Sequence, residues 1–139
     1  MRDARQALVV EPDFWVAYLQ LGQAHQQLGR DAHALDALAE AARLSRGNTK
    51  PVSITGYTFA TLGRLSEARG ILESLERRSQ EHYVPPYALA LVHAGLKDRE
   101  RMYECLDRAF SARDGHLIYL PVDPKWDVFR NDGRFIELL

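Results

Sequence analysis

Five histidines and one cysteine are the side chains that could ligate a metal ion or transfer a proton in catalysis. The histidines form no His-Glu-x-x-His pattern, and Cys105 has no second cysteine with which to share a metal ion or a disulfide. Nothing near Cys105 in the sequence marks a nucleophile, so we expect a packed, inert thiol. Glycines stand singly at turns and form no phosphate-binding loop. The sequence therefore predicts no catalytic residue, no cofactor and no metal site.

Helices would have to position these side chains, because strand patterns are scarce along the chain. Alanine, leucine, arginine, glutamate and glutamine, which favour helices, dominate up to about residue 112. Breaks recur at residues 11–13, 28–31, 46–48, 62–66, 83–86 and 95–98. This spacing predicts paired helices of about 12–15 residues joined by short turns.

Matching residue types recur every 34 positions. The sets are Leu38, Leu72 and Leu106; Gly22, Gly56 and Ala90; and Ala7, Ala41, Leu75 and Ala109. A fixed period of this length is the signature of stacked helical hairpins. Glycine inside a helix costs about 1 kcal/mol relative to alanine, so a recurring glycine indicates close approach of the partner helix. Met102 interrupts the column of Ala34 and Ala68, and we therefore expect the third hairpin to pack more loosely or at a shifted angle.

These columns resemble the tetratricopeptide repeat (TPR). The matching positions are Tyr18, Leu21, Gly22, His25, Ala34, Leu38 and Ala41 in the first repeat, Gly56, Phe59, Ala68 and Leu72 in the second, and Leu89, Ala90, His93, Met102, Leu106 and Ala109 in a degenerate third. Val52, Thr55 and Pro86 depart from the pattern. The resemblance implies an all-α fold, an α-α superhelix of antiparallel helix hairpins with a C-terminal capping segment. It also implies that His25 and His93, where the family has tyrosine, pack between helices.

The resemblance implies a single TPR domain over residues 1–139. We expect the second helix of a truncated repeat at 1–12, repeats at 13–47 and 48–82, a degenerate repeat at 83–113 and a cap at 114–139. Ala7 continues the 34-residue period into a repeat whose first helix is missing from the sequence. We therefore expect this chain to be the C-terminal piece of a longer array; a natural N-terminal cap helix is the alternative. A truncated front would expose the face around Ala4 and Leu8, through which two chains could pair as a homodimer.

The segment after residue 113 departs from the repeat. Asp123-Pro124 predicts a helix start, with aspartate as the cap and proline in the first turn, and Phe129 and Phe135 contribute to an apolar face. This segment is similar to the ends of bacterial TPR proteins, in which the repeats often follow a DNA-binding, nucleotide cyclase or protein kinase domain. That resemblance implies a part of a larger bacterial signalling or transcriptional regulatory protein.

In the TPR family the first helix of each hairpin lines a concave groove, and the resemblance implies a groove here. The residues expected to line it are Leu19, Gln23, Gln26, Lys50, Ser53, Ile54, Tyr57, Tyr87 and Leu91. The Lys, Arg and Asn clamp of the chaperone-binding relatives is missing. We therefore expect a mixed apolar and aromatic groove that takes an amphipathic helix or an apolar extended segment. The alternative is that the chain's own tail or a neighbouring helix occupies part of this surface, at Tyr87 and Leu91.

Composition limits the other classes of function. The 18 basic and 19 acidic residues are interspersed, with a net charge of −1 at pH 7. The sequence therefore contains no cluster of basic residues of the kind that binds nucleic acid. No apolar run is long enough to cross a bilayer, and the start lacks a signal-peptide pattern, so we expect a cytoplasmic protein without membrane contact. The resulting interpretation is a non-catalytic module that binds a protein or peptide partner. The alternatives are a self-associating scaffold and the accessory region of an upstream cyclase, kinase or transferase.

Overall fold

The computed structural model describes residues 15–139, and every regular element in that range is helical. The elements are the α-helices α2 (Trp15–Gln27), α3 (Asp31–Leu44), α4 (Thr49–Thr61), α5 (Leu65–Ser79), α6 (Pro86–Gly95), α7 (Arg99–Ser111) and α8 (Gly133–Leu138), and the short 3₁₀ helices η1 (Gly115–Tyr119) and η2 (Pro124–Phe129). The predicted all-α fold is confirmed. The expectations for a helix at residues 1–12 and for a face around Ala4 and Leu8 lie outside the described residues.

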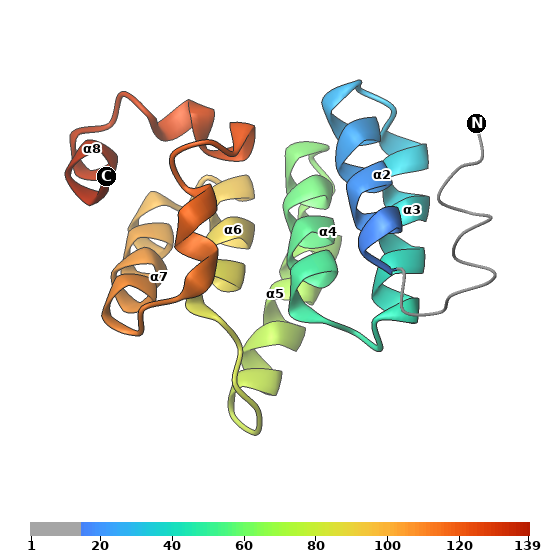
Figure 1. Cartoon of the computed structure of the whole chain (residues 1–139), viewed down its shortest axis with the longest axis horizontal. Coiled ribbons are helices and arrows are strands. Elements are labelled where there is room, and N and C mark those ends of the chain that lie inside the picture. Colours follow the sequence, from blue (N-terminus) through green and yellow to red (C-terminus); the bar gives the residue numbers. More distant parts are fainter. Residues whose placement is uncertain (1–14) are drawn as a thin grey trace.

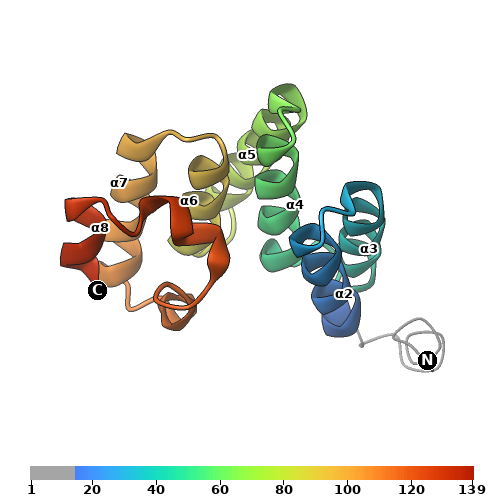
Figure 2. The ribbon, with the colours of Figure 1, turned by 90° about the horizontal axis from the view of Figure 1, so that it is seen from above.

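Six of the described helices form three hairpins, in which α2 pairs with α3, α4 with α5, and α6 with α7. Helix α4 also packs against α3 and α6, so that consecutive hairpins stack on one another (Figure 1). Seen from above, in Figure 2, the hairpins again follow one another from α2 and α3 to α6 and α7. This is the α-α superhelix that the 34-residue period predicts.

The turn inside each hairpin places an equivalent residue in the left-handed backbone region. Gly29 has a φ of 74° and Gly63 a φ of 78°, which glycine adopts without a Cβ penalty. Lys97 takes the same place in the third turn with a φ of 60°. A side chain in this conformation costs about 1–2 kcal/mol. The third hairpin therefore keeps the turn of the repeat without the residue type that favours it.

The small residues of the period do lie at close helix contacts. A Cβ atom added to Gly22 would lie 2.8 Å from Cγ of Leu38, which is too close for two carbon atoms. One added to Gly56 would lie 3.0 Å from Cγ2 of Ile71. Each glycine therefore lets its helix approach the second helix of its own hairpin, which offsets the cost of glycine inside a helix.

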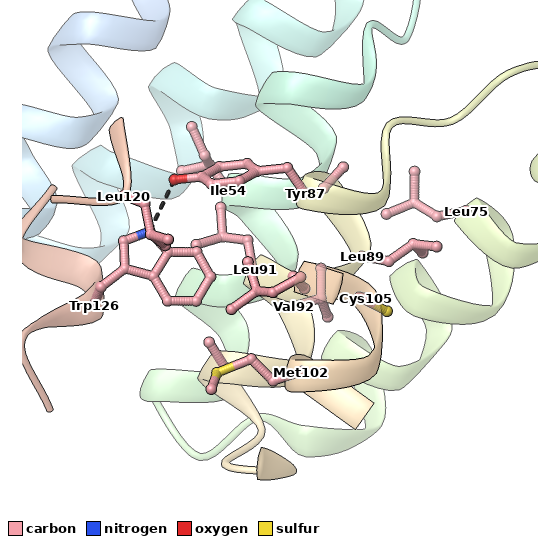
Figure 3. Packing of buried hydrophobic residues seen from close by; sticks show 14 of the residues in the cluster. Ile54, Leu75, Tyr87, Leu89, Leu91, Val92, Met102, Cys105, Leu120 and Trp126 are labelled. Carbon is pink, nitrogen blue, oxygen red and sulfur yellow. Dashed lines mark hydrogen bonds between the residues drawn. The ribbon is translucent and has the colours of Figure 1, made fainter. Parts of the chain in front are cut away.

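The third hairpin is not packed more loosely than the others, which corrects the first of the two alternatives expected from Met102. Helix α6 is buried at every residue from Tyr87 to Gly95, whereas the buried residues of α2 are Leu19 and Gly22. Met102 itself has no exposed surface and belongs to the buried cluster drawn in Figure 3. The long, unbranched methionine side chain fills space that an alanine would leave empty. The repeat position of Ala34 and Ala68 is therefore held by a larger residue in the third hairpin without loss of packing.

Residues 114–139, which we call the tail, contain η1, η2 and α8 and pack beside α6 and α7 (Figure 1). Its fully buried side chains are Leu120, Trp126, Phe129 and Phe135. Each short helix follows an aspartate whose side chain accepts a hydrogen bond from the backbone N–H two residues later. These aspartates are Asp114, Asp123 and Asp132. The cap predicted at Asp123 is thus confirmed, and three such caps allow very short helices to hold a row of buried aromatic side chains.

Candidate partner-binding groove

The first helices of the three hairpins, α2, α4 and α6, line a partly enclosed cavity of about 80 Å³, which we call the groove cavity. Its lining residues are Gln23, Thr49, Lys50, Ser53, Ile54, Pro85, Tyr87, Ala88, Leu91, His116, Tyr119 and Asp123. The sequence-based list for the groove included Gln23, Lys50, Ser53, Ile54, Tyr87 and Leu91. Residues from three separate hairpins, spread over much of the chain, thus meet around one cavity.

The other three residues of that list lie elsewhere. Leu19 is 3% exposed and belongs to the hydrophobic core. Tyr57 is half-buried, and Nζ of Lys125 lies 6.0 Å from the centre of its ring. Gln26 is half-buried on α2 and does not line the groove cavity. A substitution of Leu19 would therefore disturb the core, and it is unsuitable as a probe of binding.

The tail forms one wall of the groove cavity, in line with the alternative that the sequence left open. The indole Nε1 of Trp126 donates a hydrogen bond of 2.8 Å to the hydroxyl of Tyr87, the dashed line in Figure 3. The two ring centres lie 5.5 Å apart with the ring planes at 63°, an edge-to-face arrangement. Trp126 is fully buried and Tyr87 is 7% exposed. The chain's own tail therefore occupies the groove surface at Tyr87.

A second contact joins the tail to the first hairpin. Lys125 is 7% exposed, and its Nζ donates a hydrogen bond of 2.6 Å to Oε1 of Gln23 and lies 3.5 Å from Oδ1 of Asp123. Burial lowers the pKa of Lys125, and the nearby carboxylate of Asp123 opposes that shift. Lys125 thus links the tail to α2 across the groove, while its charge is balanced by a carboxylate of the tail.

Asp114 holds the beginning of the tail against α6. Its carboxylate accepts hydrogen bonds from the backbone N–H of Tyr87 at 3.1 Å and from that of His116 at 3.0 Å. Nδ1 of His116 lies 2.8 Å from the same carboxylate, and the His116 ring stacks on Tyr87 with 5.9 Å between centres. One side chain therefore satisfies a free N–H at the start of α6 and caps η1.

The groove-lining helices differ sharply from their partners in charge. Within α2, α4 and α6, Lys50 is the one Asp, Glu, Lys or Arg residue, whereas α3, α5 and α7 each carry at least four such residues. Nζ of Lys50 lies 4.6 Å from the centre of the Tyr119 ring, a cation–π contact. In the described part of the chain this ammonium group forms no ion pair. The groove is therefore almost neutral and carries one unpaired positive charge.

Tyr87 in the groove cavity and Tyr57 on α4 are neutral groups rather than acids. Burial, which penalises the phenolate, raises the pKa of Tyr57 and of Tyr87, and the charge of Asp123 raises both further. Both phenols therefore stay protonated at neutral pH. This arrangement provides apolar surface and directional hydrogen bonds.

Of the histidines and the cysteine, Cys105 and His93 are buried, whereas His33 and His82 are exposed. Cys105 is buried, its Sγ accepts a hydrogen bond of 3.1 Å from Arg108, and burial raises the pKa of the thiol. His93 is 5% exposed, as expected of a residue between helices. His25 is half-buried, with its ring centre 5.2 Å from that of His33. Over residues 15–139, no three metal-ligating side chains come together to form a metal site.

Sequence reasoning raised the tail as a possible occupant of this groove but did not identify which of its residues take part. The missed lining residues of the tail are His116, Tyr119 and Asp123, and those before it are Thr49, Pro85 and Ala88. Lys125 and Trp126 make the contacts that hold the tail there. The available signal was the run of three aspartates at nine-residue intervals, each opening a short helix. None of the helices in the described part of the chain is long and apolar enough to cross a membrane.

Comparison with known proteins places one hairpin of this stack in a family. Residues 16–48, which span α2, α3 and the turn between them, match the family model described as Tetratricopeptide repeat. Comparisons with curated proteins and with solved structures found no match. The matched hairpin is followed by two further hairpins at the same 34-residue period and in the same stacked arrangement. Residues 16–48 therefore form a tetratricopeptide repeat, and the stacked hairpins that follow are consistent with a TPR-like superhelix.

Proposed function

We propose that this chain is a non-catalytic module that binds a protein partner in the groove formed by α2, α4, α6 and the tail. A TPR protein is in general a protein–protein interaction module, because stacked hairpins present an extended surface. The observation that carries the proposal is the groove cavity, where Gln23, Lys50 and Tyr87 of three different hairpins converge. The likeness of the tail to those of bacterial regulators supports a role in a larger signalling or transcriptional protein.

Surface chemistry favours the groove side over the outer side of the stack. The second helices α3, α5 and α7 carry closely spaced charges of both signs, including the exposed pairs Arg43–Glu40 and Arg64–Glu67. Such a surface is well solvated and gains little on binding. The groove combines apolar and aromatic lining with a few polar groups, the composition of most binding sites. A partner segment would therefore gain most by binding there.

The test is a selection of random peptides on the full chain from a display library, followed by mapping of the selected peptides by NMR on the ¹⁵N-labelled chain. We expect the largest amide shifts at Gln23, Lys50, Ser53 and Tyr119. Shifts confined to α3, α5 and α7, or a selection that yields no peptide, would reject the proposal.

A matched pair of tyrosine variants sharpens the test. Tyr119 lines the groove cavity and is 40% exposed, and Tyr83, between α5 and α6, is 71% exposed and outside it. We expect Tyr119→Ala to weaken binding of a selected peptide about tenfold, the loss typical of a moderate contact residue. Tyr83→Ala should leave the affinity unchanged. Equal effects of the two variants would contradict groove binding.

A further inference from the structure

We propose that the partner segment places one aliphatic side chain in the groove cavity and a neighbouring Asp or Glu carboxylate on Lys50. This inference rests on the proposed function and specifies the chemistry of its ligand.

The size of the groove cavity selects an aliphatic side chain. An apolar cavity of about 150 Å³ is known to hold one benzene molecule. The groove cavity, at about 80 Å³, has roughly half that volume and is bounded by Ile54, Ala88 and Leu91. A valine, leucine or isoleucine side chain suits that space, whereas a phenyl or indole ring requires the walls to move. The walls belong to buried core helices, and such displacement costs about 1–3 kcal/mol.

The charge of the groove selects a carboxylate. Asp123 lies 3.5 Å from Nζ of Lys125, and Asp114 accepts the backbone N–H groups of Tyr87 and His116, so both carboxylates of this region already have partners. Lys50 has an aromatic face beside it but no carboxylate within ion-pair distance among the described residues. It is half-buried, so an incoming carboxylate is less screened than at a fully exposed site. A carboxylate is therefore the group that this position lacks.

A second, open cleft adjoins the groove cavity and offers room for the main chain of the partner. This cleft has a volume of about 340 Å³ and shares Gln23, Tyr119 and Asp123 with the groove cavity. Gln20 and Gln27 of α2 line its one side, and Val122, which is 72% exposed, lines the side formed by the tail. Glutamine amides both donate and accept hydrogen bonds, as the peptide groups of a partner segment require. A segment that lies in this cleft can therefore place one side chain in the adjoining groove cavity.

The experiment uses the same display library with every peptide fused to the carrier through its C-terminus, so that its carboxylates come from Asp and Glu alone. We expect selected sequences to be enriched in Val, Leu or Ile next to Asp or Glu. A selection that maps to the groove but prefers aromatic or basic residues overturns this inference and leaves the proposed function standing. A selection that yields no groove binder rejects the proposed function itself.

Charge reversal at Lys50 tests the carboxylate directly. Lys50 lies in the first turn of α4, where a negative side chain is favourable to the helix, so Lys50→Glu should fold normally. We expect it to bind a selected Leu-Glu peptide about tenfold more weakly, the effect of losing one charge-assisted contact. It should also bind the Leu-Lys version of that peptide more tightly than the natural chain does. Arg69→Glu, an exposed charge reversal on α5, is the matched control and should change neither affinity.

Filling the cavity tests the aliphatic side chain separately. Ala88 is 5% exposed and lines the groove cavity, and Ala88→Leu adds three carbon atoms to that space. We expect this variant to lose the preference for Leu over Ala in the peptide while retaining the preference for Glu over Lys. Circular dichroism and a melting curve check that it folds, and Ala88→Val serves as the milder substitution if it does not. Retention of the full leucine preference in a folded variant would overturn the cavity assignment.

Discussion

The first hairpin (α2 with α3) is closer to the repeat pattern in sequence than the third (α6 with α7), but the first helix of the third hairpin is more completely buried. The first matches the TPR family over residues 16–48, yet the buried residues of α2 are only Leu19 and Gly22. The third lies outside the matched residues and carries Pro86, Lys97 and Met102 where the repeat has other types, yet α6 is buried from Tyr87 to Gly95.

This difference shows that the repeat pattern indicates how the hairpins stack on one another but not how much of each hairpin is buried. Helix α6 lies between α4 on one side and the tail on the other, so nearly every face of it has a neighbour. Its sequence can leave the repeat pattern because the tail supplies contacts that a further hairpin would supply elsewhere in an array. The third hairpin is therefore stabilised by the tail, and the first by its own consensus residues.

The largest expected effect comes from removing the tail's central side chain. Trp126 is fully buried, packs near Phe129 and Phe135, and donates a hydrogen bond to Tyr87. Trp126→Ala should lower the free energy of unfolding by about 3–5 kcal/mol, because it leaves a cavity and an unpaired hydroxyl. The midpoint and slope of urea unfolding, followed by circular dichroism, measure this loss.

Trp15 provides the control in the first hairpin, because it is half-buried and has no comparable set of aromatic neighbours in the described residues. Trp15→Ala should cost clearly less than Trp126→Ala. Hydrogen exchange should show the loss of protection from Trp126→Ala in α6 first. Equal losses for the two variants would contradict a third hairpin that depends on the tail.

An intermediate effect is expected at the turns, where the two hairpins use one conformation with different residues. Lys97→Gly removes the strain of a side chain at a φ of 60° but raises the conformational entropy of the unfolded chain. We therefore expect the free energy of unfolding to rise by about 0.5–1 kcal/mol. Gly29→Ala, at a φ of 74° with no neighbouring atom within 4 Å, should lose about 1 kcal/mol through backbone strain alone. Thermal unfolding of both variants measures these two changes in stability. A loss of stability in Lys97→Gly would show that the lysine side chain has a role that the turn geometry does not reveal.

The smallest expected effect is a pH dependence confined to the third hairpin. Burial lowers the pKa of His93, with Arg101 and Arg108 acting in the same sense and Asp98 and Glu76 opposing them. The unfolded chain, with an ordinary pKa of about 6.5, then takes up a proton more readily than the folded one, so stability falls as the pH drops below that value. His93→Gln should reduce this loss between pH 7 and pH 5, measured as the change in melting temperature. Identical curves for the two proteins would contradict an uncharged, buried His93.

Much of the fold follows from local patterns in the sequence. The period of small and leucine residues predicts three stacked hairpins, and Gly29 and Gly63 predict the turns, because these features depend on neighbouring elements alone. The same period brings six predicted groove residues to one cavity. Leu19 was predicted at the groove but lies in the core, since a repeat position fixes the helix face only approximately and an apolar side chain gains by burial.

The position of the tail could not be predicted from local sequence patterns. Its contacts to Gln23 and Tyr87 join residues that share no period, and no rule of spacing relates Lys125 or Trp126 to them. Only the aspartate cap at Asp123 was evident, because capping is a local interaction. Long-range contacts of single side chains depend on the finished shape of the stack, and that shape exists only after the hairpins have packed.

The hydrogen bond between Gln23 and Lys125 joins residues 102 positions apart, from the first hairpin to the tail. In a repeat array where each hairpin touches only its neighbours, the two ends can fray independently and unfolding proceeds from either end. Here the tail returns from the last hairpin to α2 and closes the array into a loop of contacts. Fraying at α2 therefore loosens the tail, and loss of the tail exposes α6, so the three hairpins are expected to unfold as one cooperative unit.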